Sequence, residues 1–194
     1  MRLPAVRLLL AAALVLGLAA IPGTAAADSV AGSTTTSPVT TTAPLAPPKG
    51  AITPKPGWLP LPARSGTGRR IVYSMRGPQH VWVVDARGHV VRQFAVSGRT
   101  DRPAAGTYRV FSKSVRGVSS TYGVTFRHMI RFAHGRSAAI GFHSIPRYRD
   151  GYLVHPASML GLPIGWGGCP HLTEADARWL YSWAGVGTTV VVVR

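Results

Sequence analysis

The stretch RIVYSMRGPQHVWVVDARGHVVRQFAV, residues 70–96, indicates the fold class of this chain. Residues 70–74, 80–84 and 89–96 are rich in β-branched and aromatic side chains, which is typical of strands. The short segment 85–88 ends in glycine and joins the last two runs. Two such runs around a short turn predict a β-hairpin, so we expect the folded part to begin with strands.

Further strands are expected along the rest of the chain, at residues 107–112, 128–132, 138–142 and 188–193. The last of these is the closing run, and it is apolar almost throughout. A strand without polar alternation is typical of a sheet that is covered on both sides. We therefore expect the closing strand to be buried on both faces.

One segment carries a helix signature. Residues 173–176, Thr-Glu-Ala-Asp, resemble a capping box with aspartate in the place of the usual glutamate. A single apolar stripe follows at helical spacing and ends before Gly185; its members are Ala175, Trp179, Leu180 and Trp183. Tryptophans at this spacing are expected in the core rather than stacked on a ligand. The fold class predicted from these patterns is mainly β with one late helix.

The N-terminus has the layout of a secretory signal peptide. Arg2 and Arg7 precede an apolar run at residues 8–20, and small residues follow up to Ala27. The run is shorter than the roughly 20 residues of a membrane-spanning helix. We therefore expect residues 1–27 to be a cleaved signal peptide rather than an anchor, and the protein to be secreted.

Composition divides the remainder into two parts. Residues 28–66 are rich in Thr, Ser, Pro, Ala and Gly, and such a segment buries too little apolar surface to order its backbone. We interpret it as a disordered spacer. Residues 67–194 have the length of one compact domain that needs no disulfides.

The chain is strongly basic, with 22 Lys and Arg against 6 Asp and Glu and a net charge of +16. In an exported protein, this charge favours membrane surfaces or anionic wall polymers as partners rather than nucleic acid. The alternative interpretation is a solvated basic surface without a specific partner.

Cys169 is the only cysteine, and it lies in the glycine-rich turn 165–171. A single cysteine forms no intramolecular disulfide, so in an exported chain it is a free reactive thiol or an intermolecular link. The alternative is a small buried apolar residue. The glycines favour close backbone approach, which makes Cys169 the first candidate for chemistry.

A cysteine nucleophile needs a base within hydrogen-bond reach. Four of the seven histidines lie in or beside expected strands and are interpreted as half-exposed structural residues: His80, His89, His128 and His134. His143 follows an apolar strand, whereas His155 and His171 lie near the cysteine in the chain. Spacing alone does not choose among these three. No two histidines lie with a carboxylate or thiol at metal-ligand spacing, so no metal or other cofactor is expected.

Several blocks, in order, resemble the YkuD-type catalytic domain of the L,D-transpeptidases, in particular secreted members from high-GC Gram-positive bacteria. The resemblance covers about residue 69 to the C-terminus. Its blocks are residues 70–73, 81–85, 96–99, 103–108, 140–144, 160–163, 168–169, 176–177, 180–181 and 186–190.

The resemblance implies a β-sandwich with one helix after the nucleophile, and an enzyme that cross-links peptidoglycan. Cys169 would attack the carbonyl of the third residue of a tetrapeptide stem, D-alanine would leave, and an amine of a neighbouring stem would resolve the thioester. His143 matches the catalytic histidine, which moves the protons of the thiol and the amines. Ser144 matches the small polar residue after it, where local contacts orient the imidazole.

The oxyanion formed during acyl transfer needs preorganised donors. Pro170 has no N–H, so the residue after the nucleophile provides none. The remaining backbone candidates are the amides of Gly167, Gly168 and Cys169.

The nucleophile loop departs from the family motif Ser-His-Gly-Cys. Gly167 stands where the motif has histidine, and Gly165 or Trp166 is an extra residue. His171 could replace the missing imidazole from the other side of Cys169, with Trp166 as a second accessory residue. The preferred interpretation of His171 at this stage is a surface histidine next to the helix cap.

The expected function is therefore a peptidoglycan L,D-transpeptidase, a cysteine-dependent acyltransferase that acts as a monomer on stem peptides. Two alternatives remain open. One is a non-catalytic peptidoglycan-binding descendant of the family, and the other is an L,D-carboxypeptidase that trims D-alanine by passing the acyl group to water.

Overall fold

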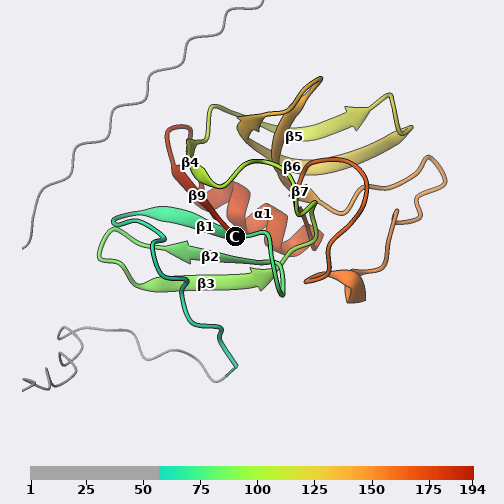
Figure 1. Cartoon of the computed structure of the whole chain (residues 1–194). Helices are drawn as coiled ribbons and strands as arrows, with labels where there is room; N and C mark the ends of the chain where they lie inside the picture. The colour runs from blue at the N-terminus through green and yellow to red at the C-terminus, as the bar shows by residue number, and fades with distance from the viewer. Residues whose placement is uncertain (1–56) are drawn as a thin grey trace, which may run out of the picture. The chain divides into compact units, whose positions relative to one another are not determined.

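The computed structural model describes residues 57–194, which form two β-sheets and one α-helix (Figure 1). The predicted signal peptide and the predicted spacer up to residue 56 lie outside the described residues. The mainly β class with one late helix is confirmed.

The first sheet has five strands in the order β3-β2-β1-β9-β4. The predicted hairpin is present, with an Asp85 turn in which the Gly88 N–H donates to the Asp85 carbonyl oxygen. The closing strand lies in the sheet interior, parallel to β1 and antiparallel to β4. The bounds are β1 Arg70–Ser74, β2 His80–Val84, β3 Val90–Ala95, β4 Gly106–Arg109 and β9 Thr189–Val193.

The second sheet has four strands in the order β5-β6-β7-β8. β5 and β6 form a long antiparallel hairpin, β7 is antiparallel to β6, and the two-residue strand β8 runs parallel to β7. The bounds are β5 Ser112–Ser119, β6 Val124–His134, β7 Ala139–Ser144 and β8 His171–Leu172.

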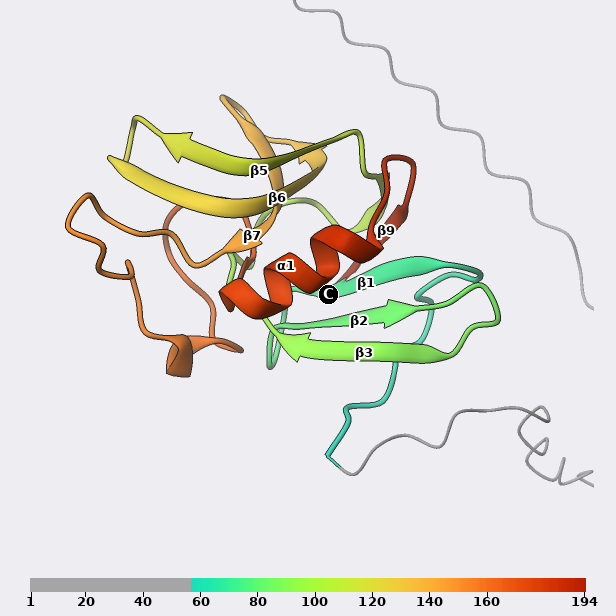
Figure 2. The ribbon, with the colours of Figure 1, turned by 180° about the vertical axis from the view of Figure 1, so that it is seen from behind.

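The helix α1, Glu174–Trp183, lies between the two sheets in both views (Figures 1 and 2). Its start is capped as predicted, because the Thr173 hydroxyl accepts from the Asp176 N–H at 3.0 Å. Ala177 and Leu180 enter the main core with residues of both sheets, and both tryptophans pack against that core. Ala175 is exposed, so its place in the predicted stripe was wrong.

The closing strand is buried on both faces, as its sequence predicts. Val190 and Val192 belong to the core between the sheets, whereas Val191 packs with Val72 and Trp82 on the opposite side of the first sheet. A short segment from the N-terminal side, including Leu61, covers that second side.

Part of the predicted spacer is ordered against this outer side. The Trp82 indole N–H donates to the Leu59 carbonyl oxygen at 3.0 Å, and the Arg70 side chain donates to the carbonyl of Ser65, which is buried. The residues that pack onto the sheet thus begin before the predicted boundary at residue 67.

The second sheet differs most from the sequence prediction. β5 was not predicted, because its sequence shows little alternation between apolar and polar residues. In the structure, its Val115 and Val118 are exposed. β7 continues through Ser144, two residues beyond the predicted end, so His143 lies inside a strand and is not on a loop. β8, which is too short to show a pattern, was also missed.

Candidate active site

Strand pairing brings the predicted nucleophile and two histidines onto one face. β7 and β8 pair in parallel with His143 beside His171, and residues paired in this way point to the same side. Two residues earlier, the same register places Gly141 beside Cys169, and the Gly141 N–H donates to the Cys169 sulfur at 3.4 Å. Cys169 lies two residues before β8, and the lining of one pocket includes it together with His143 and His171.

The thiol of Cys169 is held by backbone groups. Its sulfur accepts from Gly141 and lies 3.8 Å from the Ala139 carbonyl oxygen, toward which the S–H is directed. Within residues 57–194, no hydrogen bond joins this sulfur to a histidine. Burial raises the pKa of Cys169, although the Gly141 N–H and the charge of Arg131 oppose this effect. The thiol is therefore protonated at neutral pH.

His143 is fully enclosed but has a defined tautomer. Its Nδ1 lies 2.7 Å from the Ser144 carbonyl oxygen. A carbonyl can only accept, so Nδ1 carries the hydrogen and Nε2 has the free lone pair. The ring stacks on Phe126, with centroids 4.1 Å apart. Burial lowers the pKa of His143 to about 4, which keeps the ring neutral and able to accept a proton.

Ser144 orients this ring through its backbone. Its hydroxyl instead accepts from the Arg127 N–H at 3.0 Å. The Ser144 carbonyl, which any residue would supply, is what fixes the His143 tautomer.

His171 is not the surface residue that the sequence favoured. It is 2% exposed, in β8, with its ring centroid 4.8 Å from that of His143. Its Nδ1 lies 3.1 Å from Nε2 of His155, which is also buried. Burial, together with the positive charges that His143 and His155 can carry, lowers the pKa of His171 well below its usual value. The prediction failed because His171 lies in β8, which pairs with β7 and buries the side chain beside His143 and His155.

A pocket of about 440 Å³ opens over Cys169, His143 and His171. Its walls are the β5–β6 turn, the β6–β7 turn and the nucleophile loop. Trp166 forms part of the wall, with its ring 5.3 Å from that of His171. The charged side chains in the described lining are Arg102 and Arg136, and no carboxylate lies among them.

The predicted oxyanion donors border the same pocket. Gly167 and Gly168 line it, and Gly167 has φ +68°, a conformation that favours glycine. Among residues 57–194, the amides of Gly167, Gly168 and Cys169 donate no hydrogen bond. A side chain on Gly168 would make only ordinary contacts, so crowding by the protein does not explain that glycine. The free amides are consistent with an anion-binding role.

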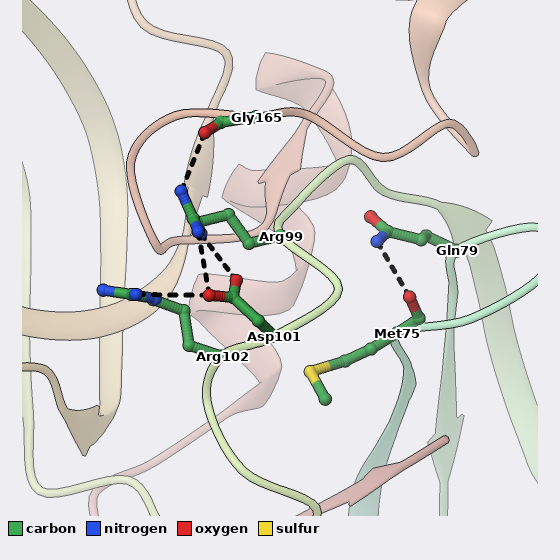
Figure 3. Close-up of polar contacts among 6 residues, drawn as sticks. All are labelled: Met75, Gln79, Arg99, Asp101, Arg102 and Gly165. Carbon is green, nitrogen blue, oxygen red and sulfur yellow. Dashed lines mark hydrogen bonds and ion pairs between the residues drawn. The ribbon is translucent and has the colours of Figure 1, made fainter.

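The loop before the cysteine is tied to the β3–β4 connection. Arg99 donates to the Gly165 carbonyl oxygen at 2.7 Å and pairs through two nitrogens with Asp101, which also contacts Arg102 (Figure 3). These cations hold the pKa of Asp101 well below its usual range. This tie could not be predicted from the sequence, because no motif relates residues so far apart.

A second tie lies deeper. The buried Gln79 donates to the Met75 carbonyl oxygen at 3.0 Å (Figure 3) and accepts from the Gly98 N–H. The Gly98 carbonyl oxygen then accepts from Ile164 at 2.9 Å, and Ser97 bridges to His171. The nucleophile loop is therefore supported from the first sheet as well as the second.

The sequence model of the YkuD domain, the L,D-transpeptidase catalytic domain, matches residues 68–192. This chain belongs to the L,D-transpeptidase family. No curated protein sequence matches it.

Solved L,D-transpeptidase structures are similar to this domain. One from Xylanimonas cellulosilytica is 19% identical with a TM-score of 0.50, and the match covers 71% of this chain and 65% of that one. One from Stackebrandtia nassauensis is 22% identical with a TM-score of 0.49, covering 66% and 56%. L,D-transpeptidase 3 from Mycobacterium tuberculosis, solved with a faropenem-derived adduct, is 22% identical with a TM-score of 0.47, covering 66% and 61%. The chain thus spans less than two thirds of the length of each.

Two further features of the described residues bear on partners. None of the helices within residues 57–194 has the length and apolarity to cross a membrane. In the same residues, no three His, Cys, Asp or Glu side chains are placed as metal ligands. The three histidines of the site are arranged by hydrogen bonding and ring contacts.

Proposed function

We propose that this L,D-transpeptidase domain cross-links peptidoglycan stem peptides through a thioester on Cys169. The observation that carries the proposal is one pocket whose lining includes the free thiol of Cys169 together with His143 and His171, which the β7–β8 register pairs. Burial of both Cys169 and His143 favours the uncharged thiol and imidazole over a thiolate–imidazolium pair.

The first half-reaction follows from this resting state. Nε2 of His143 takes the proton of Cys169 as the sulfur attacks the carbonyl of the third stem residue. The imidazolium then protonates the nitrogen of the leaving D-alanine, which restores the neutral ring. The Ser144 carbonyl keeps Nδ1 protonated throughout, so Nε2 remains the atom that exchanges protons.

The tetrahedral intermediate carries a negative oxygen. The unbonded amides of Gly167, Gly168 and Cys169 are the donors that we assign to it. Arg102 and Arg136 make the pocket positive, which suits stem peptides with free carboxylates. Anionic wall polymers are proposed as further partners of the basic surface, and the place of action is proposed to be outside the cytoplasm.

Hydrolysis remains the alternative outcome of the same acyl-enzyme, because water as acceptor would give an L,D-carboxypeptidase. A different observation supports a non-catalytic binding module. The pKa of Cys169 is raised, and its sulfur bonds to backbone groups rather than to a base.

The test is acylation by a carbapenem, followed by product analysis. We expect intact-protein mass spectrometry to show one adduct, mapped to Cys169 and absent in Cys169→Ala. His143→Gln should slow acylation about 100-fold or more, whereas His134→Gln, a control on an exposed histidine of β6, should not. A thiol that titrates but forms no adduct would favour the binding module. Muropeptides treated with the wild-type protein then distinguish cross-links from trimmed stems.

A further inference from the structure

His155 and His171 form a hydrogen-bonded pair whose tautomers can be deduced. Nδ1 of His155 lies 3.0 Å from the Pro156 carbonyl oxygen, so it carries a hydrogen and leaves Nε2 of His155 as an acceptor. That acceptor lies 3.1 Å from Nδ1 of His171, which must therefore donate. Nε2 of His171 is left with its lone pair free.

The free nitrogen belongs to a ring of the active-site pocket. His171 lines the pocket with Cys169 and His143, although its side chain is almost fully enclosed. The rings of His155 and His171 stack 5.3 Å apart at 11°, and Trp166 packs against both. The pocket thus contains two neutral imidazoles, each with its Nδ1–H bonded and its Nε2 lone pair free.

We infer that His171 is a second acid–base residue of this site, and that His155 is the positioning residue that fixes its tautomer. The inference rests on the proposed function. The His171 imidazolium would donate its Nδ1–H to a ring nitrogen, which shares the positive charge over two rings. The Nδ1–H of His143 donates to a backbone carbonyl, whereas the Nδ1–H of His171 donates to an imidazole nitrogen. The two protonated rings would therefore be stabilised by different partners.

The step that we assign to His171 is attack by the acceptor amine. The amine nitrogen bonds to the thioester carbon and passes one proton to Nε2 of His171. The C–S bond then breaks, and that proton ends on the Cys169 sulfur. The thiol and both neutral imidazoles are restored, and no further reactant is needed.

If His171 had only a structural role, its loss should affect both half-reactions alike, whereas an acid–base role should affect attack by the amine alone. The two half-reactions are therefore measured separately. Acetylation of Cys169 by p-nitrophenyl acetate needs no proton on the leaving group, and glycinamide then serves as the acceptor amine. In His171→Gln, we expect acetylation within about threefold of wild type, but aminolysis slowed about 30-fold or more. His155→Gln should slow aminolysis less, and the double variant no more than His171→Gln.

The outcomes separate the two proposals. If wild-type Cys169 is not acetylated, the proposed function fails, and the role of His171 fails with it. If wild type is acetylated but aminolysis is unchanged in His171→Gln, or both half-reactions slow equally, only the present inference is overturned. Thermal unfolding of each variant shows whether the fold is retained.

A spectroscopic measurement tests the role of His155 independently of turnover. The ring nitrogens of His171 in wild type should give ¹⁵N shifts of the Nδ1–H tautomer. In His155→Phe, which keeps a ring but removes the acceptor, we expect mixed tautomers. An unchanged Nδ1–H tautomer in His155→Phe would overturn the positioning role.

Discussion

The acidity of the Cys169 thiol is governed by its burial rather than by an ionic partner. Desolvation disfavours both the thiolate and the imidazolium, and no hydrogen bond to a histidine within residues 57–194 offsets it. In the proposed reaction, the proton therefore moves as the acyl bond forms. This differs from cysteine sites in which a neighbouring cation stabilises the thiolate in advance.

Alkylation by iodoacetamide measures this state directly. We expect the rate at Cys169 to rise with pH and to reach half its maximum above the pH at which free cysteine does so, because the pKa of the thiol is raised. Acylation by a carbapenem should fall at acidic pH as His143 protonates near pH 4. Half-maximal alkylation below pH 7 would instead indicate a preformed ion pair.

Sequence reasoning named Cys169 and His143 as residues of one site, and both line the same pocket, while their roles remain predictions. It failed on His171 because burial depends on which strand pairs with β8, and a two-residue strand has no periodicity. It also missed Phe126, which stacks on His143, since an aromatic residue in a strand gives no sign of its neighbour.

At the scale of elements, the nucleophile loop depends on supports from a distant connection. Arg99 holds Gly165, and Gly98 lies beside the backbone of Pro170. Neither contact could be predicted, because both join the β3–β4 connection to residues that are far apart in the chain. Strands β1, β2, β3 and β9 were predictable because their apolar runs are long and marked by turns.

Removing the guanidinium of Arg99 tests the first support. In Arg99→Ala, we expect carbapenem acylation to slow several-fold with little change in Tm, since the Arg99–Asp101 pair is partly exposed and such ion pairs contribute little to stability. Arg109→Ala is the matched control, because Arg109 makes a similar bond to a carbonyl, that of Gly187, outside the pocket. Equal rates for the two variants would show that the Arg99 tie does not position the loop.

Gly98 tests the second support. A Cβ there would lie 2.6 Å from the Tyr73 hydroxyl oxygen and 3.2 Å from Cα of Pro170. Because Tyr73 is fully buried, we expect Gly98→Ala to lower the free energy of unfolding by about 1–3 kcal/mol and to slow acylation of Cys169. Gly185→Ala, where a Cβ has no atom within 4 Å, is the control in chemical denaturation. A Gly98→Ala protein as stable and reactive as this control would contradict the argument.

At the scale of the whole molecule, the enclosed histidines link the stability of the domain to pH. His143 and His171 both have lowered pKa values in the folded state. The unfolded chain therefore binds protons first as the pH falls below about 6.5, and this shifts the equilibrium toward unfolding. The contribution of these two histidines to stability is therefore fully present above the pKa of histidine in the unfolded chain, and it is lost as the pH falls below that value.

Acid denaturation measures this linkage. We expect the free energy of unfolding to fall between pH 6.5 and pH 4, with His143 alone accounting for about 3 kcal/mol at pH 4. In His143→Gln, the slope over this range should be shallower than in the wild-type protein. A pH-independent stability over this range would mean that the histidines are not held neutral.

The domain organisation was less predictable than its fold class. Composition placed a boundary near residue 67, but backbone groups of Leu59 and Ser65 bond to the first sheet. A backbone carbonyl that accepts a hydrogen bond from a buried tryptophan cannot be predicted from composition, because every residue has such a carbonyl. The signal peptide and the spacer before residue 57 remain predictions.

The central claim, that Cys169 forms an acyl-enzyme with a stem peptide, is tested most directly by trapping that intermediate. The purified protein is mixed with a synthetic tetrapeptide stem that ends in D-alanine, quenched in acid and analysed by peptide mass mapping. We predict that the Cys169 peptide gains the mass of the stem without D-alanine, and that His143→Gln slows this gain. Release of no D-alanine, or an adduct that persists in Cys169→Ala, would contradict the account.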